Sequence, residues 1–167
     1  SFGHLFDSKF LTTYKYDSFF QNNELSSDFN HSVLIDFDGK LNLNSFQGRG
    51  YTAEIIDAPG NIGYPEAIET LLGEPRAIIF REIETSSLLK VKGWNINLGN
   101  QNIWELDIFS LDSFINLSDL KLLPSKLSGT GEIFLGPNLE IDNLSLSGNY
   151  EVIVPNDLSI LVKGQAQ

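Results

Sequence analysis

Cysteine and methionine are absent from all 167 residues of this sequence. Without thiols there can be no disulfide, no cysteine nucleophile and no zinc–thiolate site. Both side chains oxidise readily, so their absence favours an extracytoplasmic or secreted protein. The sequence starts at Ser1 instead of methionine, and we therefore expect a processed mature chain or a fragment of a longer one.

Basic residues are scarce, because 11 lysines and arginines stand against 22 acidic residues, which gives a net charge of −11. Such a surface repels phosphate backbones and anionic lipid headgroups, so no nucleic acid and no acidic membrane surface is expected as a partner. No apolar run is long enough for a transmembrane segment. The expected partners are protein subunits, either further copies of this chain or other proteins.

The motifs that mark common catalytic and cofactor sites are missing as well. The sequence has no G-x-S-x-G nucleophile elbow, no phosphate-binding P-loop and no G-x-G-x-x-G dinucleotide motif. Its two histidines, His4 and His31, have no neighbour at metal-ligand spacing. We therefore predict no catalytic residues, no metal ligands, no cofactor and a non-enzymatic protein.

The sequence does contain short alternations of apolar and polar residues, interrupted by Gly, Asn and Asp, which are typical of half-buried β-strands. The clearest example is SVLIDFDGKLNLN (32–44), where Asp38-Gly39 lies between two apolar runs and predicts a hairpin turn. A three-residue loop at this turn would pair Ile35 with Leu41 across two antiparallel strands and bury one consistent face.

Turn residues recur at short intervals after residue 77 and predict an all-β fold, an antiparallel sandwich or jelly-roll-like domain. Ser147-Gly148-Asn149 predicts a second hairpin loop. One short helix is predicted at 65–72 (PEAIETLL), because Pro65 suits a first helical turn and Gly73 can end the helix. No repeat of fixed period is expected, which favours a sandwich over a solenoid.

Aromatic residues gather ahead of this β-rich region. Residues 1–30 are predicted to form an N-terminal aromatic arm that ends in a polar linker, and residues 31–167 a single β-rich domain. The predicted interface residues on the arm are Phe2, Phe6, Phe10, Tyr14, Phe19 and Phe20. Because aromatic side chains are good interface anchors, the leading hypothesis is an assembly subunit that contacts its neighbours through this arm and its sheet edges. The alternative is that the arm packs on the core of its own chain.

A second hypothesis is a carbohydrate- or calcium-binding module. Carboxylates two residues apart, such as Glu105 and Asp107, share one face of a strand and offer oxygen ligands to a hard cation. Trp94 and Trp104 would be stacking platforms for a sugar unless they belong to the core. The polar outer face of any half-buried strand produces the same carboxylate spacing, so the pattern also fits an ordinary strand.

The same stretch supports a third hypothesis, a small hydrolase. Glu105-Leu106-Asp107-Ile108 resembles the start of the E-x-D-x-x-E strand motif of the family 16 glycoside hydrolases, which are jelly-roll enzymes with a retaining mechanism. The resemblance implies a nucleophile at Glu105 and a tuning carboxylate at Asp107. The acid/base position is occupied by Ser110, which lacks the second carboxyl group that a retaining mechanism needs.

Overall fold

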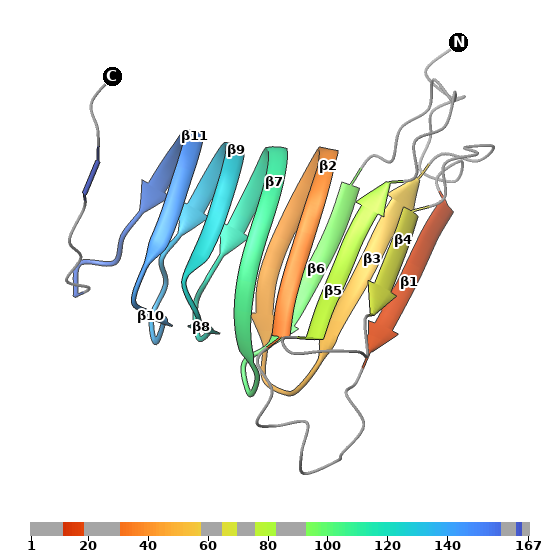
Figure 1. The fold of residues 1–167 in the computed structure, drawn as a ribbon, viewed down its shortest axis with the longest axis horizontal. Helices are drawn as coiled ribbons and strands as arrows, with labels where there is room; N and C mark the ends of the chain where they lie inside the picture. The colour runs from red at the N-terminus through yellow and green to blue at the C-terminus, as the bar shows by residue number, and fades with distance from the viewer. Residues whose placement is uncertain are drawn as a thin grey trace.

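Every regular element that the structure describes is a β-strand. The structure, a computed structural model, describes residues 12–18, 31–57, 65–69, 76–82, 93–157 and 163–164. The strands are β1 (Thr12–Ser18), β2 (His31–Phe46), β3 (Tyr51–Asp57), β4 (Pro65–Glu69), β5 (Arg76–Glu82), β6 (Gly93–Gly99), β7 (Ile103–Asn116), β8 (Lys121–Leu122), β9 (Ser125–Phe134), β10 (Glu140–Ile141) and β11 (Leu144–Ile153). They form one mixed sheet that curls on itself (Figure 1). The all-β prediction is confirmed, and the described residues include no helix that is long and apolar enough to cross a membrane.

The sheet forks at β2, its longest strand. The first half of β2 pairs with β5 and its second half with β6, while both halves pair with β7 on the other side. β5 leads on to β4, and β6 leads on to β3 and β1 (Figure 1). Phe80 of β5 packs edge-on against Trp94 of β6 and Tyr51 of β3, each at a ring-centroid distance of 5.3 Å. The two branches therefore face each other across one core, as the layers of a sandwich do in the broad sense.

Beyond β2 the strands are parallel and the chain coils. Ile108, Leu127 and Leu146 lie side by side on β7, β9 and β11, so each turn of the coil takes 19 residues here. The short strands β8 and β10 form another side of the coil and are parallel too. The predicted antiparallel pairing is correct for β1–β3, β3–β6 and β4–β5 and wrong for the remaining pairs. Because a short strand returns the chain after each long strand, the next long strand runs in the same direction.

The predicted hairpin at Asp38-Gly39 is wrong. Both residues lie inside β2, whose register against β7 shifts between Phe37 and Lys40 and so marks a β-bulge. A bulge bends a strand without reversing it, so Ile35 and Leu41 belong to one strand on either side of a bend. The predicted inward face is confirmed, because both side chains are fully buried.

The second predicted hairpin, at Ser147-Gly148-Asn149, is wrong for the same reason. β11 is continuous, and Gly148 lies in register with Gly129 of β9 and Ser110 of β7. Gly129 and Gly148 have φ angles of 113° and 107°, which residues with a side chain rarely adopt. A Cβ on Gly129 would overlap the Ser110 carbonyl oxygen, and one on Gly148 would overlap the Gly129 carbonyl oxygen. The glycines thus allow neighbouring strands to bend in the same place.

The helix predicted at 65–72 is wrong where the structure describes it. Pro65–Glu69 is strand β4, paired antiparallel with β5, and residues 70–72 lie outside the described residues. Helix propensity is a weak preference that pairing with a neighbouring strand overrides. Within the predicted arm, Thr12–Ser18 is strand β1 on the edge of β3. The rest of the arm and its linker lie outside the described residues.

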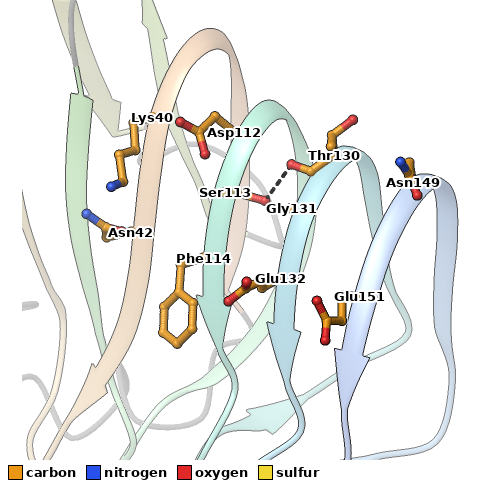
Figure 2. A pocket seen from close by; sticks show the side chains of 10 residues that line it. All are labelled: Lys40, Asn42, Asp112, Ser113, Phe114, Thr130, Gly131, Glu132, Asn149 and Glu151. Carbon is orange, nitrogen blue, oxygen red and sulfur yellow. Dashed lines mark hydrogen bonds between the residues drawn. The ribbon is translucent and has the colours of Figure 1, made fainter.

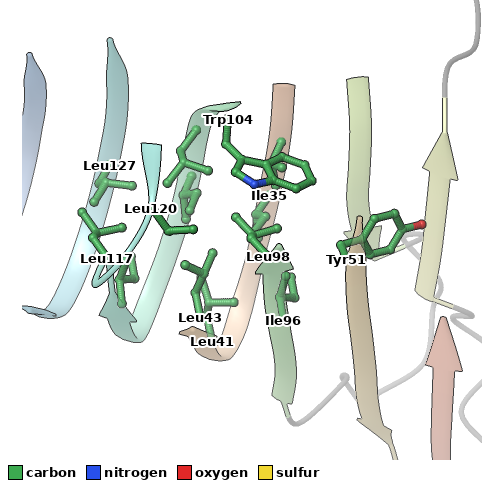
Figure 3. Close-up of a cluster of buried hydrophobic side chains, with 14 of the residues drawn as sticks. Ile35, Leu41, Leu43, Tyr51, Ile96, Leu98, Trp104, Leu117, Leu120 and Leu127 are labelled. Carbon is green, nitrogen blue, oxygen red and sulfur yellow. The ribbon is translucent and has the colours of Figure 1, made fainter. Parts of the chain in front are cut away.

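Apolar side chains fill the inside of the coil, as Figure 3 shows. Trp104, one of the two largest buried residues, donates a hydrogen bond of 2.8 Å from Nε1 to the Gly99 carbonyl oxygen. Leu117, Leu120 and Leu127 continue this core along the coil (Figure 3). At β7 and β9, which have a described strand on each side, the inside of the turn is therefore sealed by the turns on both sides of it.

Candidate functional site

Two successive turns of the coil carry the same sequence pattern. Leu127-Ser128-Gly129 and Leu146-Ser147-Gly148 are each followed, three residues later, by a glutamate, Glu132 or Glu151. The register of β9 with β11 places the two patterns side by side. The expectation of no fixed-period repeat is therefore wrong. The recurrence of L-S-G-x-x-E after 19 residues is the sequence signal that reveals the coil.

The second of these turns, β11, lies at the edge of the described part of the sheet, and we call this side of it the free edge. It pairs with β9 on one side, and no described residue pairs with its other side. Leu146 is 41% exposed and Val152 is 37% exposed, whereas Leu127 and Ile133 beside them on β9 are 1% and 0% exposed. The end of the coil thus combines core-type side chains with a backbone edge that another strand can pair with.

Strand β11 has few of the features that protect sheet edges. Natural edge strands are often shielded by charged residues, above all lysine, or by proline. Glu151 is the one charged residue among the ten residues of β11 (LSLSGNYEVI), which include no lysine and no proline. The bend at Gly148 is the one feature that interrupts its regularity. A strand of this composition can accept a further strand at its edge.

A hollow of 640 Å³ on the outer face of the bend reaches this edge (Figure 2). Within the hollow, the strand registers place four residues side by side in one row across β2, β7, β9 and β11. They are Asn42, Phe114, Glu132 and Glu151. Asn42 Nδ2 donates a hydrogen bond of 2.9 Å to Asn95 Oδ1 on β6, which fixes the amide at one end of the row. The other lining residues are Lys40, Asp112, Ser113, Thr130, Gly131 and Asn149.

The hollow becomes more negative toward β11. Near β2, Lys40 lies in register with Asp112, so opposite charges are neighbours there. Glu132 and Glu151 lie in register with each other, and like charges directly opposite destabilise a strand pair. A cationic group placed beside Glu151 would relieve this repulsion. Among the described residues, no group of three or more His, Cys, Asp or Glu side chains is placed to hold a metal ion.

Tyr150 of β11 packs against the core, and its hydroxyl oxygen is buried. Its register partner on β9 is Gly131, which in turn lies beside Ser113 of β7. A Cβ on Gly131 would overlap the carbonyl oxygen and hydroxyl of Ser113, so the glycine allows β7 and β9 to approach closely at this point. Burial raises the pKa of Tyr150, and the Ser113 hydroxyl lowers it to a smaller extent. The neutral phenol is therefore the form that suits this position.

The structure separates the residues predicted for ligand binding. Trp94 and Trp104 are fully buried, so the core rather than a surface holds both rings. Glu105 is half-buried and Asp107 exposed on β7, and neither lines the hollow. Ser110, at the acid/base position of the hydrolase resemblance, is buried at the bend.

Of the residues predicted for the interface, the structure describes only Tyr14, which lies at the opposite end of the sheet from β11. Tyr14 lies in β1, with its backbone opposite Ile55 of β3. The other predicted anchors lie outside the described residues, namely Phe2, Phe6, Phe10, Phe19 and Phe20. The sequence predicted contacts through sheet edges in general, but it did not identify β11 as the edge with exposed core-type residues.

No protein-family profile matches this sequence, and no curated protein matches it. Solved structures do resemble its fold. A protein from Clostridium sporogenes ATCC 15579, provisionally described as a cell adhesion protein, has a TM-score of 0.67 at 15% identity, over 89% of this chain and 74% of that chain. An adhesin, also provisionally described, from Parabacteroides merdae ATCC 43184 has a TM-score of 0.50 at 14% identity, over 86% of this chain and 55% of that chain. These likenesses show the fold, and this chain spans little more than half of the Parabacteroides protein.

Proposed function

We propose that this chain is a non-catalytic assembly subunit outside the cytoplasm that contacts neighbouring protein subunits through the free edge of its sheet. The observation that carries the proposal is the exposure of Leu146 and Val152 on β11, at positions that are buried one turn earlier on β9. Full burial of a leucine or valine side chain is worth about 1.5–3 kcal/mol. Covering this edge with a strand from another subunit would supply part of that energy and pair the backbone as well.

Two properties support a location outside the cytoplasm. The chain has no cysteine or methionine, the residues most sensitive to oxidation. Two solved structures that resemble its fold are provisionally described as a cell adhesion protein and an adhesin. The expected partners are therefore protein subunits at a surface or in an extracellular assembly.

The placement of the carboxylates supports a role without catalysis. Glu105 and Asp107 lie on the outer face of an ordinary strand, and the nearby position that the resemblance assigns to the acid/base is Ser110. Glycoside hydrolysis needs a second carboxyl group at a defined separation. Glu105→Gln should leave any activity found in this protein unchanged, and a loss of activity would contradict the non-catalytic role.

The native mass of the full chain tests the assembly role. Light scattering over a series of protein concentrations should show association of the unmodified chain. Leu146→Lys places a charge on the inward face of β11 and should abolish association. Ser147→Lys adds the same charge on the outward face of the same strand and should leave association largely intact. A monomer at every concentration, or equal behaviour of the two variants, would overturn the proposal.

A second function, binding of a carbohydrate in the hollow, is favoured by the position of Phe114. Its ring is exposed between Asn42 and Glu132, and an aromatic face beside hydrogen-bonding groups suits a sugar ring. A glycan panel should then show binding that Phe114→Ala removes. Phe109→Ala is the matched control, because Phe109 is equally exposed on β7 but does not line the hollow.

A further inference from the structure

The charges that line the hollow do not cancel. Lys40 is the one base among its described lining residues, and it stands against three acids, Asp112, Glu132 and Glu151. Because Lys40 and Asp112 lie in register, the excess negative charge falls on the two glutamates, which are exposed and lie in register with each other. A ligand that carries a positive charge is therefore drawn to this end of the hollow, and an acidic ligand is repelled.

The ring of Phe114 adds a second attraction for a cation. It is 37% exposed and lies between Asn42 and Glu132 in the row (Figure 2). The face of an aromatic ring attracts a cation within about 6 Å of its centroid. Neighbouring strands are about 4.8 Å apart, so a cation over Phe114 also lies within reach of the Glu132 carboxylate on β9. An ammonium group attached to an apolar ring can use both attractions at once.

Amide groups lie at the other end of the row. Asn42 Nδ2 donates a hydrogen bond to Asn95 Oδ1, which holds the two amides in place. Each side-chain amide has two N–H donors and an oxygen with two acceptor sites, so the bonded pair still offers positions to the hydroxyl groups of a ligand. From Asn42 on β2 to Glu151 on β11 the row crosses three strand spacings, or about 14 Å. A ligand of this length that has both hydroxyl groups and a positive charge matches the two ends.

An amino sugar carries both kinds of group on one ring. Its ring has an apolar face for Phe114, its hydroxyl groups suit Asn42, and its ammonium group suits Glu132. A lysine side chain brings the charge without the hydroxyl groups, and a neutral sugar brings the hydroxyl groups without the charge. The row therefore favours a glycan with amino groups over a basic peptide.

We infer that the hollow binds glycans whose sugar units carry protonated amino groups, with the sugar ring on Phe114 and the ammonium group beside Glu132 and Glu151. This inference rests on the carbohydrate-binding function proposed for the hollow and names the class of sugar. The site uses only the outward faces of four strands, so it does not depend on what covers the edge of β11. Acetylation of the amino groups removes their charge and should weaken binding.

Titration calorimetry of the full chain with three oligosaccharides of equal length tests the inference. The β-1,4-linked oligomers of glucosamine, N-acetylglucosamine and glucose differ only in the group on the second carbon of each ring. The titrations are done at about pH 5.5, where carboxylates are ionised and amino groups are protonated. We expect the glucosamine oligomer to bind about tenfold more tightly than either of the others, because it alone pairs a charge with the glutamates.

Glu132→Gln identifies the carboxylate. This substitution keeps the shape of the side chain and removes its charge, so it should lower the affinity for the glucosamine oligomer about tenfold and leave the affinity for the glucose oligomer nearly unchanged. Glu140→Gln is the matched control, because Glu140 is exposed on β10, another side of the coil, and does not line the hollow. It should change neither affinity. Equal losses in the two variants would trace binding to the net charge of −11 instead of the hollow and would overturn the inference.

The outcomes separate the inference from the functions proposed above. Equal affinity for the three oligomers would overturn the amino-sugar inference and keep carbohydrate binding, whereas no binding of any oligomer would overturn both. Tetralysine tests a basic peptide as the source of the cation. If it binds as tightly as the glucosamine oligomer, the inference is overturned in favour of a protein partner. The assembly role is tested separately by the native mass.

Discussion

The two turns of the coil at β9 and β11 have nearly the same sequence and very different surroundings. Both carry L-S-G-x-x-E, both bend at a glycine with a φ angle near 110°, and they are paired in register along their whole length. β9 has a strand on each side, while β11 has a described neighbour on one side only. Leu127 and Ile133 on β9 are therefore buried, whereas the equivalent residues on β11, Leu146 and Val152, are more than a third exposed.

This contrast shows that burial in a coil depends on the neighbouring turns as much as on the residue. A leucine at the same place in the repeat is core in one turn and surface in the next. Coiled folds of this kind are stabilised by contacts between nearest-neighbour turns, and their end turns need a cap or a partner. Substitutions at equivalent positions of β9 and β11 measure that dependence directly.

The largest effect is expected from Gly129→Ala. The new Cβ would overlap the Ser110 carbonyl oxygen, and alanine would have to adopt a φ angle of 113°. Backbone strain and overpacking together should lower the free energy of unfolding by about 4 kcal/mol. Gly148→Ala has the same defect on the end turn, where β11 can move away, so about half that loss is expected. Urea unfolding followed by tryptophan fluorescence gives both values, and equal losses would contradict the nearest-neighbour explanation.

Leu127→Ala and Leu146→Ala remove the same atoms from equivalent positions. At Leu127 the deletion leaves a cavity in the core, so a loss of about 3 kcal/mol is expected. At Leu146, which is 41% exposed, the loss should be about 1 kcal/mol. Chemical denaturation at low protein concentration keeps association out of the comparison. A loss at Leu146 as large as that at Leu127 would indicate that β11 is covered in solution.

Tyr150 has a glycine, Gly131, as its equivalent on β9, so its titration reports on the end turn alone. Burial holds the pKa of Tyr150 above its ordinary value of about 10. The folded state then keeps the proton more tightly than the unfolded state, and stability should fall as the pH rises above about 10. This contribution is fully present below that pH. In Tyr150→Phe the melting temperature should fall less steeply as the pH rises above about 10. An equally steep fall in this variant would show that another group causes it.

The smallest effect is expected from Glu151→Gln. It removes one of two like charges that face each other across β9 and β11, so it should stabilise the monomer by less than about 0.5 kcal/mol. The gain should shrink at high salt. Thr130→Gln, on β9 opposite Asn149 and so outside this row, is a control that should show no salt-dependent gain.

Part of the fold could be predicted from the sequence because alternation is a local property. Ile35 and Leu41 were predicted to share a buried face and do so, since residues two apart point to the same side of a strand whatever its neighbours are. The hairpins could not be distinguished from bends. Asp38-Gly39 and Gly148 mark places where the backbone can leave the regular strand conformation. Both a hairpin turn and a bulge or bend need such residues, so the local sequence does not distinguish them.

The candidate site was less accessible to prediction. Both tryptophans were considered as surface platforms, but they are fully buried because β6 holds Trp94 inside the fork and β7 holds Trp104 inside the coil. The row from Phe114 to Glu151 combines residues of three strands that the parallel registers align. The 19-residue recurrence of L-S-G-x-x-E predicts that alignment when the repeat is recognised.

The sequence by itself determined that this chain forms strands, which of their faces are apolar and at which residues they can bend. The tertiary structure decided whether each bend reverses the chain, because that depends on where the next strand finds hydrogen-bonding partners. It also decided that Leu127 is core and Leu146 is surface. Two leucines in the same local sequence differ only through the strand that does or does not cover them.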